Sequence, residues 1–253
     1  MAAPLILLIV DEPQRSDGRP SGRRRFLSER RSDLHDLGPG AQFRWVNHGT
    51  RLAVREFIVK AKLGGGARAL DYGCGTGPYR SELPGDAEYV GADIPGNPTA
   101  AIEIRDDGTV PVPDGSFDVV LSTYALEHVE HPETYLSECY RVLRPGGTLV
   151  LSVPLLMYYH RDPEDYWRWT QAGVRSIVEA AGFTLAEMRG LLGMAAAAVQ
   201  IFQDGTLWRI PRPVKRVYIV VMQALIRFID RFYSEELRLE NPLVLIARAV
   251  KPS

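Results

Sequence analysis

The sequence has little cysteine, little net charge and no long apolar run, and each of these absences excludes a class of protein. Two cysteines among 253 residues give neither a disulfide framework nor the spacing of a zinc site. A net charge of −1 offers no overall attraction to nucleic acid. The apolar residues 1–10 are too few to span a membrane and lack the basic start of a signal peptide. A reducing, cytoplasmic setting is therefore the default expectation.

Residues 11–40 are rich in arginine, serine, glycine and proline, with runs of arginine at 23–25 and 30–31. Such a composition is typical of a solvated segment, and we expect residues 1–40 to form a flexible basic arm. An arm that attracts an anionic substrate or surface is the alternative, and nothing local decides between the two. The folded domain is expected to occupy residues 41–253.

Helical and strand patterns alternate after residue 43. Helices are expected at 43–63, at 132–143 and, from an N-cap at Thr170, at 171–181. Strands are expected at 67–72, 88–93, 101–104, 117–122, 148–153, 185–189 and 243–250. This alternation predicts a doubly wound α/β fold whose ligands bind at the carboxyl ends of the strands.

The segment 191–240, between the last two expected strands, is too long for an ordinary connection and is expected to be a helical insertion. In 215–233 the polar residues share one narrow arc of a helical wheel: Arg216, Gln223, Arg227, Asp230 and Arg231. The remaining apolar surface favours core packing, a homodimer interface or a cover over an active site, so monomer and homodimer both stay open. Peripheral membrane contact through 213–233 is the alternative.

The first expected strand ends in an acid and a loop that reads Asp71-x-Gly73-x-Gly75-x-Gly77. Glycine allows positive φ and lets a ligand lie against the backbone. A helix that began after Gly77 would add its free N–H groups to the same site. Asp71 would repel a pyrophosphate but suits a positively charged ligand such as S-adenosylmethionine. Asp93, at the end of the second expected strand, is placed to accept the hydroxyls of a ribose.

Three further blocks follow this loop in order: 106–118, with its Asp-Gly-Ser-Phe-Asp end; the Leu-Glu-His-Val of 126–129; and the Arg-Val-Leu-Arg-Pro-Gly-Gly of 141–147. Together with 70–77 they resemble the motifs of class I S-adenosylmethionine-dependent methyltransferases, in the type 11 group that includes quinone-biosynthesis-like enzymes. The resemblance covers about residues 65–185. It implies a Rossmann-like methyltransferase fold with a mostly parallel, seven-stranded sheet and the helical insertion before the last strand.

The same resemblance implies S-adenosylmethionine as the cofactor and assigns its contacts. Asp71 and the glycine backbone would hold the methionine end, Asp93 the ribose, and Asp106 the adenine amino group. Asp107 stands where the family usually has a small residue, so at that position only a backbone contact is implied. The expected cofactor-binding residues are Asp71, Gly73, Cys74, Gly75, Gly77, Asp93, Ile94, Asp106, Asp107, Ser122 and Thr123.

The stretch 158–170 follows the fifth expected strand and mixes titratable groups with aromatic rings, as a substrate site does. His160 is the candidate general base because histidine titrates near neutral pH, and a polar loop histidine is the alternative. The candidate substrate-binding residues are His128, Tyr159, Asp165, Trp167 and Arg168. For Asp165 and Arg168 an ion pair that fixes the loop is equally open, and for Trp167 simple packing.

These observations predict a methyltransferase acting on a hydroxyl of a small molecule, a sugar or a lipid-linked glycan. Carbon methylation of a quinone-like or lipid acceptor is one alternative, and a non-catalytic binding module of the same fold is another. Nucleic-acid methylation is disfavoured, because no Asn/Asp-Pro-Pro-Tyr/Phe motif follows the fourth expected strand. No group of residues has metal-ligand spacing, so no metal is expected.

Overall fold

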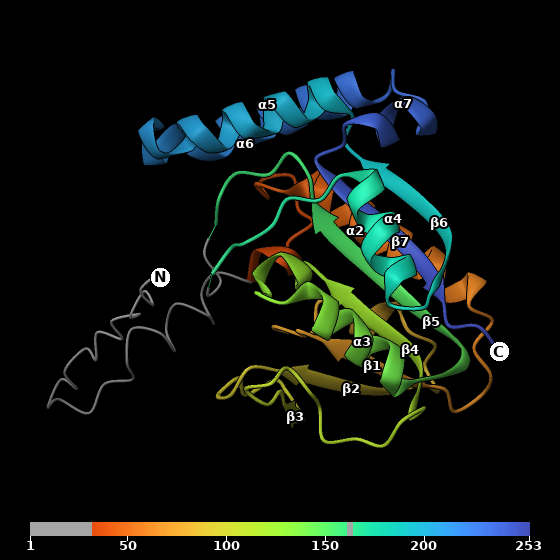
Figure 1. The fold of residues 1–253 in the computed structure, drawn as a ribbon. Coiled ribbons are helices and arrows are strands. Elements are labelled where there is room, and N and C mark those ends of the chain that lie inside the picture. Colours follow the sequence, from red (N-terminus) through yellow and green to blue (C-terminus); the bar gives the residue numbers. More distant parts are fainter. Residues whose placement is uncertain (1–31, 161–163) are drawn as a thin grey trace, which may run out of the picture.

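The structure, a computed structural model, describes residues 32–160 and 164–253; most of the expected arm lies outside these ranges. The described residues form one sheet of seven strands in the order β3-β2-β1-β4-β5-β7-β6 (Figure 1). The strands are β1 (Arg68–Tyr72), β2 (Glu88–Asp93), β3 (Ile102–Glu103), β4 (Phe117–Thr123), β5 (Leu143–Pro154), β6 (Thr184–Leu191) and β7 (Val244–Val250). β7 runs antiparallel to both of its neighbours, whereas the other paired strands are parallel.

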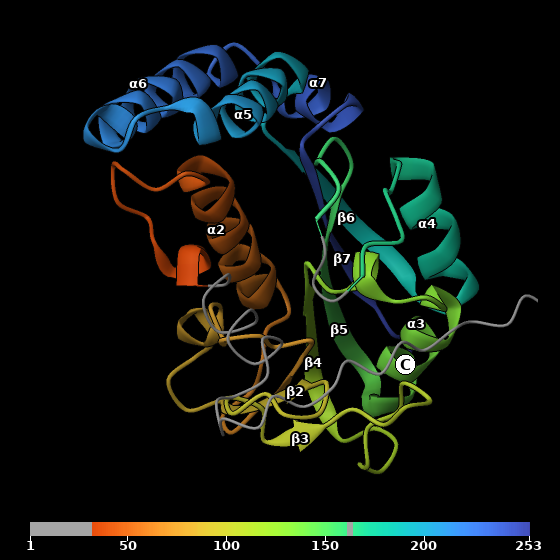
Figure 2. The same ribbon diagram turned by 90° about the vertical axis from the view of Figure 1, so that its left-hand side faces the viewer.

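Helices cover both faces of this sheet (Figure 2). The α-helices are α2 (Arg44–Lys60), α3 (Pro132–Val142), α4 (Gln171–Ala180), α5 (Met194–Thr206), α6 (Arg212–Asp230) and α7 (Glu235–Glu240). The 3-10 helices are η1 (Ser32–His35), η2 (Arg80–Glu82), η3 (Leu126–His128) and η4 (Leu207–Arg209). Among the described residues, no helix is both long enough and apolar enough to cross a membrane.

Alternating side chains of the central strands form two apolar layers. On one face Val119 and Leu121 of β4 pack with Val54 and Phe57 of α2. On the other face Val120 packs in a larger cluster with residues of α3 and α4. Successive strand residues point to opposite faces, so an uninterrupted apolar strand such as β4 is the expected result of burial on both sides.

The expected alternation of strands and helices is confirmed, and Thr170 caps α4 as predicted by accepting a hydrogen bond from the Gly173 N–H at 3.1 Å. The helix that was considered after Gly77 does not form, and only the short η2 follows. Pro84 disfavours helical backbone at Leu83, which is extended, so a helix has no room to form before β2.

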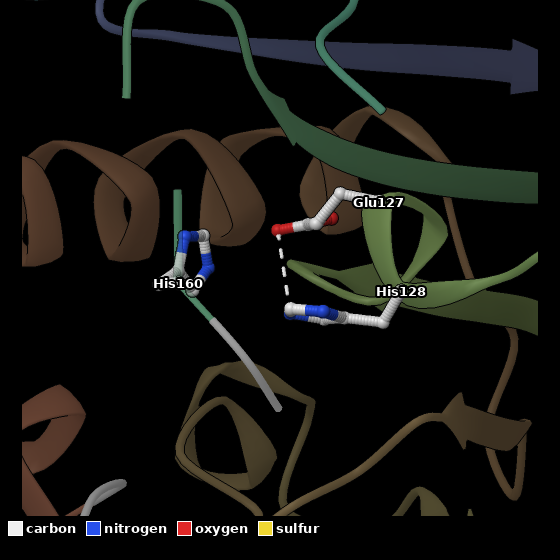
Figure 3. A group of neighbouring side chains, drawn as sticks. All are labelled: Glu127, His128 and His160. Carbon is white, nitrogen blue, oxygen red and sulfur yellow. Dashed lines mark ion pairs between the residues drawn. The ribbon is translucent and has the colours of Figure 1, made fainter. Parts of the chain in front are cut away.

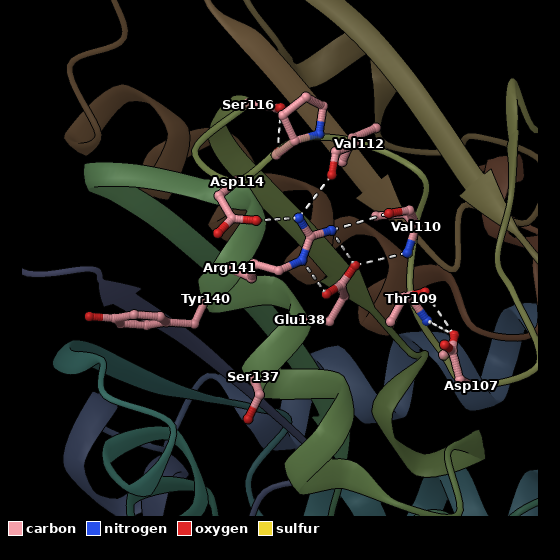
Figure 4. A network of polar contacts seen from close by, with 12 residues as sticks. Asp107, Thr109, Val110, Val112, Asp114, Ser116, Ser137, Glu138, Tyr140 and Arg141 are labelled. Carbon is pink, nitrogen blue, oxygen red and sulfur yellow. Dashed lines mark hydrogen bonds and ion pairs between the residues drawn. The ribbon is translucent and has the colours of Figure 1, made fainter.

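The segment 105–116, between β3 and β4, is held by one arginine of α3 (Figure 4). The Arg141 guanidinium donates to both carboxylate oxygens of Glu138, at 2.7 Å each, and to Asp114 Oδ1 at 2.6 Å. It also donates to the carbonyl oxygens of Val110 and Val112. Asp114 is therefore part of a turn that leads into the buried strand β4, and its contact with Arg141 helps to place that strand.

The insertion before the last strand is a pair of helices, α5 and α6, lying side by side across one end of the sheet (Figures 1 and 2). α5 follows β6, and β6 is parallel to β5 because both are antiparallel to β7. The pair therefore leaves the sheet at the edge formed by the carboxyl ends of the parallel strands. We call α5, η4 and α6 the helical hairpin.

Candidate active site

The loop after β1 has the conformation that its glycines predict. Gly73, Gly75 and Gly77 have φ values of 85°, 53° and 68°, a region that other residues rarely adopt. A Cβ atom on Gly73 would lie 2.7 Å from the Cβ of Ala125, so the loop packs directly against the segment that follows β4. The Gly73 and Cys74 N–H groups donate to the carbonyl oxygen of Ala92, which ties the loop to β2.

Two acids lie at the ends of adjacent strands beside this loop. Asp71, at the end of β1, is fully buried and its Oδ2 accepts a hydrogen bond from the Tyr89 hydroxyl at 2.8 Å. Burial and the neighbouring Asp71 carboxylate raise the pKa of Tyr89, which keeps that hydroxyl a donor. Tyr89 was not predicted, because a position in a strand does not show which side chain it faces.

Asp93, at the end of β2, is held in a fixed orientation. Its Oδ2 accepts hydrogen bonds from the Gly75 N–H and the Asn97 amide, both at 2.7 Å, and its Oδ1 accepts one from the Ile94 N–H at 2.8 Å. Asn97 also donates to the Gly75 carbonyl oxygen at 2.7 Å. Asn97 was not predicted; an asparagine between two prolines reads simply as a turn residue.

Asp106 and Asp107 lie in the exposed turn after β3. The Asp107 carboxylate accepts hydrogen bonds from the N–H and the hydroxyl of Thr109, at 2.9 and 2.7 Å, and these bonds hold the pKa of Asp107 below its usual value. The side chain of Asp107 therefore braces its own turn. The adenine contact of Asp106 stays a prediction.

Ser122 and Thr123, at the end of β4, are both buried. The Tyr135 hydroxyl donates to the Tyr72 carbonyl oxygen at 2.8 Å and lies 2.8 Å from Ser122 Oγ, so the Ser122 side chain helps to join β4, β1 and α3. Tyr124 comes next, with a φ of 51° that is unusual for a bulky residue. Its hydroxyl lies 2.7 Å from Thr50 Oγ1 of α2. No sequence pattern marked Tyr124.

Three ligand-type side chains meet beyond the end of β4 (Figure 3). Glu127 and His128 belong to η3, and His160 approaches from the segment after β5. One ligand atom from each of the three side chains lies within 4.8 Å of the other two. The sequence predicted no metal-ligand spacing, because residues 128 and 160 are far apart in the chain. In the folded chain this group has the composition to bind a divalent cation or to accept a proton.

The hydrogen bonds of the two histidines define their basic atoms. His128 Nδ1 lies 2.5 Å from the Glu164 carbonyl oxygen, and His160 Nδ1 lies 3.1 Å from that of Tyr158. A carbonyl oxygen only accepts, so both Nδ1 atoms carry hydrogen and both lone pairs are on Nε2. His128 Nε2 is 4.0 Å from a carboxylate oxygen of Glu127, which is fully buried.

Asp165 and Arg168 form the ion pair that was one of their two expected roles. The guanidinium donates to both Asp165 oxygens, at 2.5 and 2.6 Å, and to the Met157 and Tyr158 carbonyl oxygens. Burial raises the pKa of Asp165, but the Arg168 hydrogen bonds and the His160 N–H reverse this and lower it overall. Because these charges neutralise each other, the pair positions His160 rather than offering a charge to a substrate.

The aromatic residues of this segment differ in exposure. Trp167 is partly exposed and its indole N–H donates to the Val129 carbonyl oxygen at 2.8 Å, so it packs against the segment after η3. Tyr159 is 60% exposed and is the better placed of the two to meet an acceptor. The Tyr166 N–H donates to the Glu127 carbonyl oxygen at 2.8 Å, which joins the segments after β4 and β5.

Comparisons with known proteins identify the kind of domain in which this site lies. Residues 70–151, from the glycine loop to the end of β5, match the methyltransferase domain family model. This part of the chain is therefore similar to the methyltransferase domain of S-adenosylmethionine-dependent enzymes. The matched range contains the four sequence blocks, Asp71 and Asp93, whereas His160 and the helical hairpin lie outside it.

Individual relatives are similar over a part of the chain. The demethylmenaquinone methyltransferase of Thermus thermophilus is 36% identical over 133 residues, which are 46% of this chain and 56% of that protein. The ubiquinone biosynthesis O-methyltransferase of Cereibacter sphaeroides is 33% identical over 115 residues, covering 40% and 44%. The chain thus spans about half the length of such curated relatives.

The fold is shared more widely than the sequence. The chain is similar to the solved structure of the 1,6-didemethyltoxoflavin-N1-methyltransferase of Burkholderia thailandensis, with a TM-score of 0.54 and 18% identity over 96% of this chain and 94% of that one. At this identity the likeness shows the fold alone. The architecture predicted from the sequence, a mostly parallel seven-stranded sheet of the Rossmann-like methyltransferase type, is confirmed.

Proposed function

We propose that the chain transfers the methyl group of S-adenosylmethionine to a hydroxyl of a small-molecule, sugar or lipid-linked glycan acceptor. The observation that carries this proposal is that residues suited to the cofactor and residues suited to proton removal lie at the same edge of the sheet. The acids at the ends of β1 and β2, together with the glycines of the loop, suit a cationic nucleoside. The imidazoles in the segments after β4 and β5 can take the proton that an acceptor hydroxyl loses. The contact between Gly73 and Ala125 brings the two together.

The residues at this edge fit the cofactor. Asp71 lies where a carboxylate would attract the ammonium and sulfonium charges, and the positive-φ loop lets a ligand approach its backbone. Asp93, oriented by Gly75, Asn97 and its own neighbour Ile94, would accept the ribose hydroxyls. The bound cofactor supplies a methyl group that is already activated by a sulfonium, so alignment of the acceptor is the larger part of the protein's task.

His160 is the proposed general base. Its Nε2 has the lone pair, and the Glu127 carboxylate in the same group would stabilise the imidazolium that forms when the acceptor loses its proton. His128 approaches the His160 ring edge-on, with a centroid distance of 5.2 Å, and would limit the position of the acceptor. The ion pair of Asp165 with Arg168 holds the backbone at His160 and so orients the base.

The test is a two-step measurement on the full chain. Calorimetry with S-adenosylhomocysteine measures occupation of the cofactor site, and a screen of hydroxylated acceptors then measures release of S-adenosylhomocysteine from S-adenosylmethionine. Binding together with turnover on a hydroxylated acceptor supports the proposal. Binding without turnover on any acceptor would favour a non-catalytic module, and absence of binding would contradict both.

A specific observation also favours a second acceptor class. The helical hairpin at the same sheet edge has large apolar side chains on its outer surface, among them Phe202 and Trp208, which are 61% and 72% exposed. An apolar surface here would suit a lipid-borne or quinone-like acceptor, methylated on carbon or on oxygen. Relatives of this chain are named as ubiquinone and menaquinone methyltransferases, which supports including such acceptors in the screen.

A further inference from the structure

The outer surface of α6 carries an apolar row along its whole length. The row consists of Val214, Val217, Val221, Leu225, Phe228 and, just beyond the helix, Phe232. Each is between 43% and 65% exposed in the part of the chain that the structure describes. Their spacing of three or four residues throughout places them on one face. We call this set the outer row. Soluble proteins rarely leave so many large apolar side chains together in water.

The opposite face of α6 already provides the packing of the hairpin. Ile219, Met222 and Ile226 are buried there, and Ile226 packs with Ala196 and Ala197 of α5. α6 is therefore apolar on two faces, of which the protein's own core uses one. The outer row therefore does not contribute to the packing of the hairpin.

Polar side chains that would normally cover a surface helix are turned inward. Gln223 is 1% exposed, and its amide donates to the Gln42 carbonyl oxygen at 2.7 Å and to Gln200 and Gln203 of α5. Asp230 accepts a hydrogen bond from the Gly193 N–H at 2.9 Å. The hairpin thus hides its amides and a carboxylate while it exposes valine, leucine and phenylalanine.

Basic residues accompany the exposed apolar side chains. The Arg231 guanidinium lies 4.1 Å from the ring centre of Phe228 and 4.6 Å from that of Phe232, and the Arg209 guanidinium lies 4.7 Å from the ring centre of Trp208. Between residues 194 and 232 the basic residues are Arg209, Arg212, Lys215, Arg216, Arg227 and Arg231. The acids there are Asp204 and Asp230, and both are held in hydrogen bonds inside the hairpin.

We propose that the outer row docks onto an anionic lipid surface, with α6 lying in the plane of the headgroups. Exposed apolar and aromatic side chains would enter the acyl boundary, and Arg209, Arg212 and Arg231 would meet lipid phosphates. The charge selects this occupant over a second copy of the chain, because two such faces would bring like charges together. Docking would bring the edge of the sheet where the acceptor is proposed to bind next to the membrane surface. The docking itself does not require the chain to transfer a methyl group.

Co-sedimentation of the full chain with vesicles tests this inference. Vesicles of phosphatidylcholine with 30% phosphatidylglycerol are compared with phosphatidylcholine alone. The triple variant Val217→Ser/Leu225→Ser/Phe228→Ser is expected to weaken binding to the anionic vesicles by at least about tenfold. Replacing Arg209, Arg212 and Arg231 by Gln is expected to weaken it by about fivefold for each arginine at low salt, and to remove the preference for phosphatidylglycerol.

The matched control is Leu52→Ser/Val59→Ser on α2, which removes apolar side chains that are 51% and 70% exposed elsewhere on the surface. It should bind vesicles like the unchanged protein. Calorimetry with S-adenosylhomocysteine and a thermal melt of each variant show that the fold persists. Absence of vesicle binding by the unchanged chain overturns the inference. So does a dimer, seen in sedimentation velocity, that the triple variant converts to monomer.

Discussion

The glycine-loop edge of the sheet and the helical hairpin lie at the same end of the molecule but are built in opposite ways. At the loop, the buried Asp71 and the oriented Asp93 are held by hydrogen bonds, and the glycine backbone has positive φ values. In the hairpin, amides and carboxylates are inside, and a row of valine, leucine and phenylalanine is outside. On this contrast we base the proposals that the first region binds a polar, cationic molecule and that the second binds an apolar surface.

The largest expected effect is at the loop, with Gly73→Val. The new Cβ would lie 2.7 Å from the Ala125 Cβ at a φ of 85°, so strain and overlap act together. Affinity for S-adenosylhomocysteine is expected to fall by about a thousandfold or more in calorimetry. Gly64→Ala is the control, because nothing lies within 4 Å of its added Cβ. Equal affinity in both variants would show that the loop does not hold the cofactor.

The second largest effect is expected for His160→Ala, at a residue that belongs to neither the glycine loop nor the helical hairpin. Turnover is expected to fall about 100-fold, at the lower end of what a general base provides, because alignment of the acceptor remains. Affinity for S-adenosylhomocysteine should not change. The exposed His48→Ala is the matched control. Full activity of His160→Ala would remove this residue as the base.

The group of Glu127, His128 and His160 allows a sharper version of that experiment. If His160 acts as a base, EDTA leaves turnover unchanged. Loss of activity with EDTA, restored by a divalent cation, would instead show that the three side chains hold a metal ion.

The smallest expected effect concerns the polar interior of the hairpin. Asp204, within α5, accepts hydrogen bonds from the amides of Gln42 and Gln200. Burial raises its pKa from 3.8 to about 6, and these hydrogen bonds offset only part of that shift. The folded state therefore binds this proton more tightly than the unfolded state. The free energy of unfolding consequently falls as the pH rises from about 4 to about 6, and the penalty is complete above that range.

Asp204→Asn keeps one acceptor oxygen and removes the charge. It should raise the free energy of unfolding by about 1–3 kcal/mol at pH 8 and by little at pH 4, measured by urea titration. A variant that is equally stable, or less stable, at pH 8 would show that the hairpin interior tolerates the charge without cost.

The sequence predicted the two regions unequally well. The fold and the cofactor edge followed from local patterns, because buried parallel strands, strand-ending acids and glycine loops each leave a mark within a few residues. Contacts between distant residues left no such mark. Tyr89 with Asp71, Asn97 with Gly75, and His160 with Glu127 depend on how strands stack and loops return, which spacing along the chain does not show.

The hairpin illustrates a different limit. The helical wheel placed Arg216, Gln223, Arg227, Asp230 and Arg231 on one arc, but periodicity does not tell which side of a helix faces the protein. In the structure Gln223 and Asp230 of this polar arc are buried, while the apolar row is exposed. The absence of a long helix after Gly77 was also not foreseen, although Pro84 marks the place where such a helix has to end.

The most direct measurement is calorimetric titration of the full chain with S-adenosylhomocysteine, compared with Asp93→Asn and with NAD⁺ as a second ligand. One site per chain is expected for S-adenosylhomocysteine, with affinity at least about tenfold weaker in Asp93→Asn because one of the oriented ribose acceptors is lost. NAD⁺ should give no heat of binding, since Asp71 would repel its pyrophosphate. Saturable binding of NAD⁺ without binding of S-adenosylhomocysteine would contradict the assignment of this sheet edge to a methyl donor.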